Sequence, residues 1–306
     1  MALTDYIPKL TDGSLDLEGV DLSPLSDLTR DEIEELALAW KEIDPKRRRN
    51  IVTTLSEKAR DSVQFDFNSI FLMSLRDSDE DVRFLSIYGL AEYEDRPGFA
   101  PLSDILLGDE SPRVRAAAAE ALARYAHLAA EGKLLSRNSQ RLHEAFLEVL
   151  GNDLVDEQVR QKALEGVAYY NDADIRALIQ NFYTTGSIKM RRSAVVAMGR
   201  NGDPIWLETI AGELSNVREE MRIQGAVALG ELGEEDGVPY LIATLKDDDS
   251  SEVQLAIIQA LGKIGGSLAK LALKKVHESG DEVLKEASEE ALHQFEFDNN
   301  PLGPAV

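Results

Sequence analysis

The chain has 306 residues, of which 43% are apolar, and its 33 Lys and Arg against 56 Asp and Glu give a formal net charge of −23. A chain this acidic is a poor partner for nucleic-acid backbones and anionic membranes, because both are bound by basic patches. The absence of cysteine excludes disulfides, thiolate metal sites and a cysteine nucleophile, while the apolar fraction is enough for a folded core.

Residues 1–28 form an acidic segment that Gly, Ser and Pro interrupt and that is only weakly periodic. Its scattered leucines predict either a cap along the first repeat or a mobile stretch. The start of the chain lacks the basic region and apolar run of a secretory signal. The longest charge-free stretch, Ala177 to Ile188, is too short and too polar to span a bilayer. We therefore expect a cytoplasmic protein.

The stretch from Asp31 to Leu55 predicts a first, divergent pair of helices. Apolar residues three to four apart predict a helix that ends near Trp40, and Asp44-Pro45 predicts a turn before the second helix. Lys46-Arg47-Arg48-Arg49, the only basic run, opens that second helix. In an acidic chain such a run favours a solvated helix face that pairs with nearby Asp and Glu, and contact with an acidic partner or RNA is the alternative.

From residue 82 onward, an apolar anchor followed by a basic or polar residue recurs at spacings of 32, 45, 31, 31, 32 and 31. A fixed period of this length is the signature of a repeat architecture, and the spacing of 45 predicts an insertion near 131–141. The seven pairs are Val82-Arg83, Val114-Arg115, Val159-Arg160, Met190-Arg191, Met221-Arg222, Val253-Gln254 and Leu284-Lys285.

Other positions repeat relative to the anchor. Offsets zero, four, seven, eight and eleven form one stripe of an α-helix. All seven residues at offset seven are Gly or Ala, which allows a neighbouring helix to approach closely. Three residues before the anchor, six of seven residues are Ser or Asp, which predicts helix N-caps. The exception is Arg218, and we expect that helix to begin at Asn216 instead.

A second apolar segment precedes each cap, so each unit is predicted to consist of helix A, a tight turn and helix B. No unit can bury its apolar stripe alone, and the units must stack. The prediction is an all-α, right-handed α-solenoid of about seven to eight two-helix repeats, which forms a single elongated domain over residues 29–296. Residues 297–306 contain too many helix breakers and predict a flexible tail.

Three segments carry a family likeness: Asp81-Val82-Arg83, Ser111 to Leu122 (SPRVRAAAAEAL) and Ala226 to Gly233 (AVALGELG). They resemble HEAT repeats, of the subtype named after phycobilisome lyases, and the likeness extends from about Phe65 to Glu296. The resemblance implies the fold. It says little about function, since such repeats serve scaffolds, adaptors and lyases alike.

Three kinds of enzyme share this type of repeat. Bilin lyases attach or isomerise pigments, but no residue pattern here singles out a pigment pocket. HEAT-like alkylpurine glycosylases need a basic face for DNA, which an acidic chain does not favour. Deoxyhypusine hydroxylases bind iron through His-Glu pairs just after the anchor, whereas His143-Glu144 and His277-Glu278 lie in predicted A helices. With four His in the chain, we predict no metal site, no cofactor and no catalytic residue.

The basic residue after the anchor predicts a structural ladder. Asp or Asn recurs in the turn before it, and an arginine fork that binds such a turn would tie neighbouring repeats together. A groove lined by arginines for phosphate or an acidic peptide is the alternative. Acidic clusters such as Asp77 to Asp81 lack the EF-hand pattern and favour capping and solubility over Ca²⁺. The predicted ladder consists of Arg83, Arg115, Arg160, Arg191 and Arg222.

The B-helix face at offsets two, six and nine points away from the packing stripe, and in such folds it lines the concave side. A mixed apolar and acidic face suits a basic amphipathic or extended peptide. The alternative is that adjacent B helices bury these side chains between them. The apolar candidates for partner binding are Phe84, Tyr88, Val196, Ile223, Val227 and Leu255. The other residues expected on this face are Ala116, Glu120, Gln161, Glu165, Glu286 and Glu290.

The predicted function is a non-enzymatic protein–protein interaction or scaffold/adaptor module that binds another protein or peptide, basic or amphipathic, through the concave face of the B helices. The alternative is a bilin-lyase-like or other small-ligand-handling enzyme on the same scaffold. A third hypothesis is an accessory subunit that binds through its A helices. Trp206, Tyr240 and Tyr183 are then candidate contacts, although core packing is favoured for each.

Overall fold

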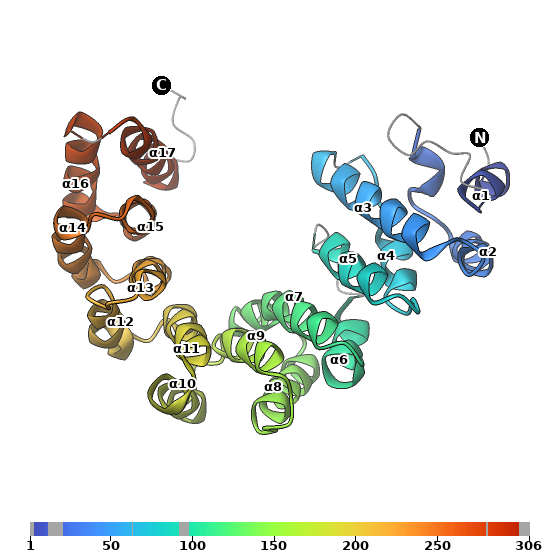
Figure 1. Ribbon diagram of the computed structural model, residues 1–306, viewed down its shortest axis with the longest axis horizontal. Helices are drawn as coiled ribbons and strands as arrows, with labels where there is room; N and C mark the ends of the chain where they lie inside the picture. The colour runs from blue at the N-terminus through green and yellow to red at the C-terminus, as the bar shows by residue number, and fades with distance from the viewer. Residues whose placement is uncertain (1–2, 12–20, 63, 92–97, 280, 300–306) are drawn as a thin grey trace. The chain divides into compact units, whose positions relative to one another are not determined.

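The computed structural model describes residues 3–11, 21–62, 64–91, 98–279 and 281–299, and every regular element in these ranges is helical. Eight pairs of A and B helices follow one another in the described residues, which confirms the predicted all-α solenoid of two-helix repeats (Figure 1). Contacts divide the chain into two compact units, Met1–Ala163 and Leu164–Val306, called unit 1 and unit 2 below.

Unit 1 begins with α1 (Leu3–Thr11) and the short 3-10 helix η1 (Ser23–Leu25), and four helix pairs follow. The A helices are α2 (Arg30–Trp40), α4 (Asn68–Ser74), α6 (Phe99–Gly108) and α8 (Ser136–Leu150). The B helices are α3 (Pro45–Asp61), α5 (Glu80–Leu90), α7 (Pro112–Ala130) and α9 (Glu157–Val167), of which α9 extends past the boundary of the unit.

Unit 2 holds the remaining four pairs, with the A helices in one layer and the B helices in the other (Figure 1). Two short 3-10 helices, η3 (Pro204–Trp206) and η4 (Glu235–Gly237), lead into α12 and α14. The A helices are α10 (Ala173–Thr185), α12 (Leu207–Glu213), α14 (Val238–Asp247) and α16 (Gly266–Ser279). The B helices are α11 (Ile188–Asn201), α13 (Glu219–Leu232), α15 (Ser251–Ile264) and α17 (Glu282–Asn299).

The B helices of unit 2 lie close together because small residues face one another. A Cβ added to Gly199 of α11 would lie 2.9 Å from Cα of Ala228 on α13, and one added to Gly230 of α13 would lie 2.9 Å from Cα of Ala260 on α15. Both alanines occupy the predicted small position at offset seven. Both glycines stand at offset nine, which the sequence predicted to point outward. That prediction is wrong, because offset nine faces the following B helix.

The six predicted Ser and Asp caps accept a backbone N–H in the first turn of their helices, which confirms them. The exception is α13, the helix with Arg218 at the predicted cap position: it begins at Glu219 and not at Asn216. Asn216 instead accepts the backbone N–H of Arg218 through its side-chain oxygen, at 3.0 Å, and so closes the turn before the helix. The confirmed caps are Asp79, Ser111, Asp156, Ser187, Ser250 and Asp281.

The N-terminal segment, the insertion and the C-terminal end, which the sequence predicted to depart from the repeat, are helical over much of their described length. Helix α1 packs on α2, and its fully buried Tyr6 donates a hydrogen bond to the carbonyl of Asp21 at 3.0 Å, while residues 12–20 lie outside the described ranges. The long spacing lengthens α7, which has 19 residues against 11 in α5. Helix α17 continues to Asn299, past the expected end at 296, because the first proline in this stretch is Pro301.

Candidate functional site

The predicted B-helix face of unit 1 centres on two aromatic residues of α5. Asp79 caps this helix, and Phe84 and Tyr88 follow one turn apart on the same side. Their ring centroids lie 4.8 Å apart at a tilt of 56°. Tyr88 is 47% exposed, whereas Phe84 is half-buried. The pair therefore presents an aromatic edge to solvent.

A cation from the next B helix covers one of these rings. The guanidinium carbon of Arg113, at the start of α7, lies 3.7 Å from the centroid of the Phe84 ring, within the range of a cation–π interaction. Arg113 also donates to Asp81 of α5 at 2.5 Å. The two contacts hold the guanidinium over the ring, while the Arg113 side chain remains half-exposed.

An ion pair lies beyond Tyr88. Lys162 of α9 contacts Glu120 of α7 at 3.2 Å. Burial, with a smaller contribution from the negative charge of Glu120, raises the pKa of the Tyr88 hydroxyl above its usual value, so the hydroxyl stays protonated and can donate. Three consecutive B helices thus present two aromatic rings, two cations and one carboxylate, which we call the aromatic patch: Phe84, Tyr88, Arg113, Glu120 and Lys162.

Sequence reasoning found the two aromatic residues and Glu120 of this patch but missed both cations. Other residues expected on the same face are not exposed. Ala116, Gln161 and Glu165 are at most 8% exposed, so for these three the open face is wrong and the alternative, burial of the side chain, holds. Glu165 accepts a hydrogen bond from the Ser193 hydroxyl at 2.7 Å, which satisfies one carboxylate oxygen in the interior.

The predicted face residues of unit 2 form no comparable cluster. Val196 lies on α11, Ile223 and Val227 lie one turn apart on α13, and Leu255 lies on α15. All four are half-buried. They occupy offsets two and six of consecutive B helices whose backbones the Gly–Ala contacts bring close together. They therefore offer narrow apolar strips between helices rather than fully exposed side chains.

Two of the predicted ladder arginines make the same set of contacts. Arg83 binds both carboxylate oxygens of Asp109, at 2.8 and 2.9 Å, and Arg222 binds both oxygens of Asp248, at 2.6 and 3.2 Å. In each case the carboxylate belongs to the turn of the next repeat. A further N–H donates to the carbonyl six residues earlier. Gln254, the exception in the pattern, keeps this carbonyl contact with its amide at 2.8 Å.

The other three ladder arginines differ in their partners. Arg191 contacts Glu213 of α12, a 2% exposed side chain in the A helix of the next repeat. Arg160 reaches Asp153 of its own turn at 3.0 Å, and that carboxylate is 90% exposed. Arg115 donates to a carbonyl of α6 at 2.9 Å. Arg83, Arg191 and Arg222 therefore each link their own repeat to the next one.

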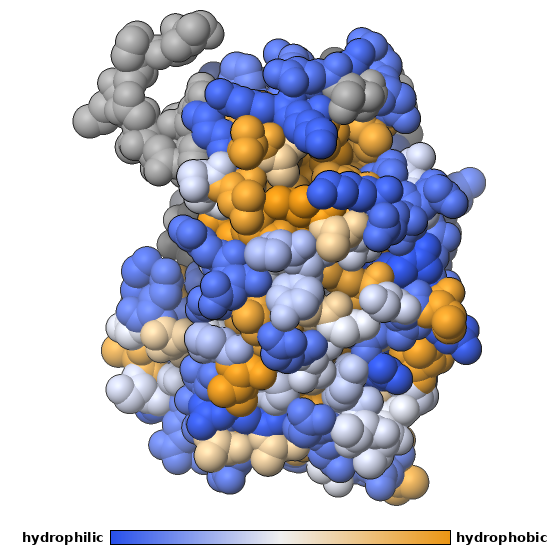
Figure 2. Space-filling model, turned by 90° about the vertical axis from the view of Figure 1, so that its left-hand side faces the viewer, coloured by the Kyte–Doolittle hydropathy of each residue, from blue (hydrophilic) through white to orange (hydrophobic). Residues whose placement is uncertain are grey.

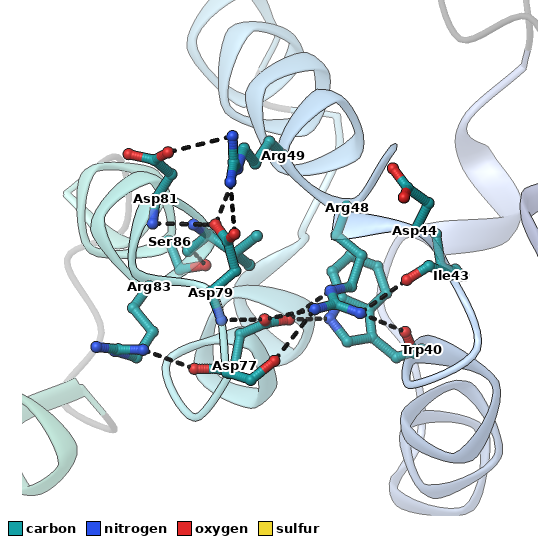
Figure 3. A network of polar contacts seen from close by, with 12 residues as sticks. Trp40, Ile43, Asp44, Arg48, Arg49, Asp77, Asp79, Asp81, Arg83 and Ser86 are labelled. Atoms are coloured by element: carbon teal, nitrogen blue, oxygen red, sulfur yellow. Dashed lines mark hydrogen bonds and ion pairs between the residues drawn. The ribbon is translucent and has the colours of Figure 1, made fainter. Parts of the chain in front are cut away.

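The first two repeats share a buried polar network, drawn in Figure 3. Arg48, on α3, is 6% exposed and spans both oxygens of Asp77, with Nε 2.9 Å from one and Nη2 3.0 Å from the other. Its Nη1 donates to the carbonyl of Ile43 at 2.7 Å. The indole N–H of Trp40 donates to Asp77 at 2.6 Å. One buried carboxylate thus joins α2, α3 and the following turn.

The basic run is therefore not a uniform solvated face. Lys46 is exposed, but Arg48 lies three residues before Ile51, on the stripe that α3 buries. The expected pairing with acids does hold for Arg49, which binds both oxygens of Asp79 at 2.6 and 2.9 Å. The acidic cluster before α5 is accordingly used for capping and ion pairs.

The Asp248–Arg222 pair predicts a measurable pH dependence. Arg222 holds the pKa of the Asp248 carboxyl below its usual value of 3.8, through hydrogen bonds that outweigh the effect of burial. A lowered folded-state pKa stabilises the protein fully above the unfolded pKa and loses that contribution as the pH falls through the folded one. We expect Asp248→Asn to lower the urea midpoint at pH 7. The difference in urea midpoint between the variant and the wild type should become smaller below pH 4. A difference that stays constant with pH would contradict a stabilising Asp248–Arg222 ion pair.

The A-helix side of unit 2 carries a different surface. Apolar side chains gather over α14 and α16 (Figure 2), where Leu268 and Leu271 are 48% and 66% exposed. Of the three aromatic residues weighed as contacts there, Trp206 is buried and donates to Asn201, and Tyr183 donates to the Glu213 carboxylate. Tyr240 is 39% exposed and donates to Glu208 at 2.9 Å.

The described residues contain no group of three or more His, Asp or Glu side chains placed to hold a metal ion. Both His-Glu pairs lie on A helices, His143-Glu144 on α8 and His277-Glu278 on α16. In the same ranges, no helix combines the length and the apolar character that crossing a membrane requires.

Comparisons with known proteins concern the fold. No curated protein matches the sequence. Among solved structures, the CpcE–CpcF complex of phycocyanin lyase from Nostoc sp. PCC7120 is 16% identical, over 75% of this chain and 93% of that one, with a TM-score of 0.48. Human deoxyhypusine hydroxylase is 16% identical over 96% and 97%, with a TM-score of 0.37, and importin beta is 16% identical over 96% and 45%, with a TM-score of 0.49. The family described as HEAT repeats matches residues 69–140 and 207–293, just over half of the chain.

Proposed function

Because the chain belongs to the HEAT-repeat family, we propose that it is a non-enzymatic scaffold or adaptor that binds another protein through the face of its B helices. The fold itself is compatible with protein interaction, and the finer assignment depends on the surface. We also propose that the protein is cytoplasmic, as the sequence leads us to expect.

The aromatic patch on α5, α7 and α9 is the observation that carries the proposal. Tyrosine and arginine are the residue types that contribute most to binding energy in protein interfaces. Here Tyr88 is 47% exposed and Arg113 is half-exposed, and both are already oriented by contacts with Phe84. An oriented side chain loses less conformational entropy on binding than a free one.

The charges of the patch suggest the partner. Glu120 lies next to Tyr88 and stays 49% exposed in its ion pair with Lys162, so it can accept a second cation, and Asp81 lies beside Arg113. A partner segment that covers Tyr88 with an apolar side chain and offers a Lys or Arg to Glu120 would match both features. The proposed partner is therefore an amphipathic protein segment with basic residues beside its apolar contact.

A quantitative pull-down from native extract tests the proposal. Tyr88→Ala should reduce recovery of the bound partner about tenfold, since one anchoring tyrosine contributes on the order of 1–2 kcal/mol. Tyr240→Ala is the matched control, because it removes an exposed tyrosine from the A-helix side. Ile223→Asp and Leu255→Asp probe the strips of unit 2. Equal recovery with Tyr88→Ala and wild type, with both folded by circular dichroism, would contradict the assignment of the binding face.

A further inference from the structure

A groove of about 660 Å³ lies on the A helices of unit 1, among α2, α4 and the start of α6. Its lining is mainly apolar, and each of the apolar lining residues is only half-buried by the rest of the protein. These residues are Ile33, Ala37, Leu72, Met73 and Pro101. The groove thus exposes part of its apolar lining to water, which is the usual property of a binding groove rather than of a core.

Helix α2 adds an exposed apolar residue beside the groove. Leu38 is 73% exposed and stands four residues after Glu34 and three before Lys41, two residues that line the groove. Residues with this spacing share one side of a helix. A partner that enters the groove would therefore also approach Leu38 and could remove it from water.

Two cations line the same end of the groove. Lys41 is the C-cap of α2, and Arg76 follows the C-cap of α4. Both are exposed, and neither contacts a carboxylate in the part of the chain that the structure describes. The acid that lines the groove, Glu34, is already paired with Arg30 at 3.0 Å.

These cations differ from most others in the unit. Arg48, Arg49 and Arg83 each bind a carboxylate, as expected in a chain with a net charge of −23. Lys41 and Arg76 keep their positive charges available beside an apolar surface. Charge complementarity therefore selects a partner that carries carboxylates next to its apolar residues.

The dimensions of the groove suit a helical partner. The nine residues from Ile33 to Lys41 are eight helical steps and span about 12 Å along α2, or roughly two helical turns. A helix laid alongside would place apolar residues at positions i, i+3 or i+4, and i+7 into the groove. Met73 in the lining has a flexible thioether side chain that adapts to different apolar groups.

We propose that this groove docks an acidic amphipathic helix of another protein, with its apolar stripe on α2 and α4 and a carboxylate beside Lys41 and Arg76. The site lies on A helices and does not depend on the B-helix face of the proposed function. The protein would then hold two partners of different chemistry, one on each type of helix.

Binding of two fluorescein-labelled synthetic helices to the full chain tests the proposal. Both carry Leu at i, i+4 and i+7. One has Glu and the other Lys at the flanking positions. The Glu helix should bind at least tenfold more tightly than the Lys helix, and the preference should weaken with added salt because rim charges are screened. The double variant Lys41→Glu/Arg76→Glu should bind the Glu helix at least tenfold more weakly than the wild type.

Lys246→Glu/Lys274→Glu is the matched control, since it makes the same charge change at two exposed lysines of unit 2. It should bind the Glu helix as the wild type does, and so should Tyr88→Ala, which separates this site from the B-helix face. Three results would overturn the proposal: no binding of the Glu helix, equal binding of both helices, or a Lys41→Glu/Arg76→Glu variant that binds normally. Sedimentation that reveals a dimer broken by that double variant would assign the groove to a second copy and overturn the proposal as well.

Discussion

Asp77→Ala is expected to lower the free energy of unfolding by about 3–5 kcal/mol, because it leaves a buried arginine without its counter-ion. The side chains of Arg48 and Asp77 are 7% and 2% exposed. The same carboxylate also accepts the indole N–H of Trp40 and the backbone N–H of Asp79. The substitution therefore removes several hydrogen bonds and strands a charge in one step.

Chemical unfolding followed by circular dichroism measures this effect, and two further variants isolate its cause. Asp153→Ala removes a ladder carboxylate that is 90% exposed, so it should change stability by less than about 0.5 kcal/mol. Arg48→Met/Asp77→Leu removes both charges and should recover the part of the loss that comes from the stranded arginine, while the N–H groups of Trp40 and Asp79 still lack their acceptor. If Asp77→Ala matches Asp153→Ala, the network does not stabilise the junction between the first two repeats.

The sequence predicted the repeats well because their signals are local. The anchor, the offset-seven small residue and the cap lie within about ten residues of one another, so helix geometry alone relates them. Offset nine shows the limit of this reasoning. A glycine there fits an open face as well as a close contact, and only the position of the next helix decides between them. For Gly199 and Gly230 the next helix is in contact.

The candidate site was likewise predictable only where its residues lie close together on one helix. Phe84 and Tyr88 lie one turn apart on one helix, and their proximity follows from their spacing. Arg113 and Lys162 reach the patch from two other helices, α7 and α9. How far one helix is shifted along its neighbour depends on their packing and cannot be predicted from the sequence of either helix. Arg48 is a related case, because the basic run around it is visible in the sequence but the burial of one member depends on how α3 turns toward its neighbours.

The close approach of the B helices was likewise unpredictable in its detail, but it gives a sharp prediction. Gly230→Ala should lower the free energy of unfolding by about 1–3 kcal/mol, the usual cost of forcing a methyl group into a filled contact. The new Cβ would lie 2.9 Å from Cα and 3.1 Å from Cβ of Ala260, so the backbones of α13 and α15 must separate. This strain exceeds the gain of about 0.5–1 kcal/mol that alanine normally brings to a helix.

Gly212→Ala is the control, because it makes the same chemical change on α12 with nothing within 4 Å of the added methyl group. That variant should keep or raise the melting temperature, while Gly230→Ala lowers it by several degrees. The double variant Gly199→Ala/Gly230→Ala should lose more than either single change, since it separates α11 from α13 and α13 from α15. If Gly230→Ala is instead as stable as Gly212→Ala, the B helices of unit 2 can repack around a larger residue, and a close backbone approach is not what holds these repeats together.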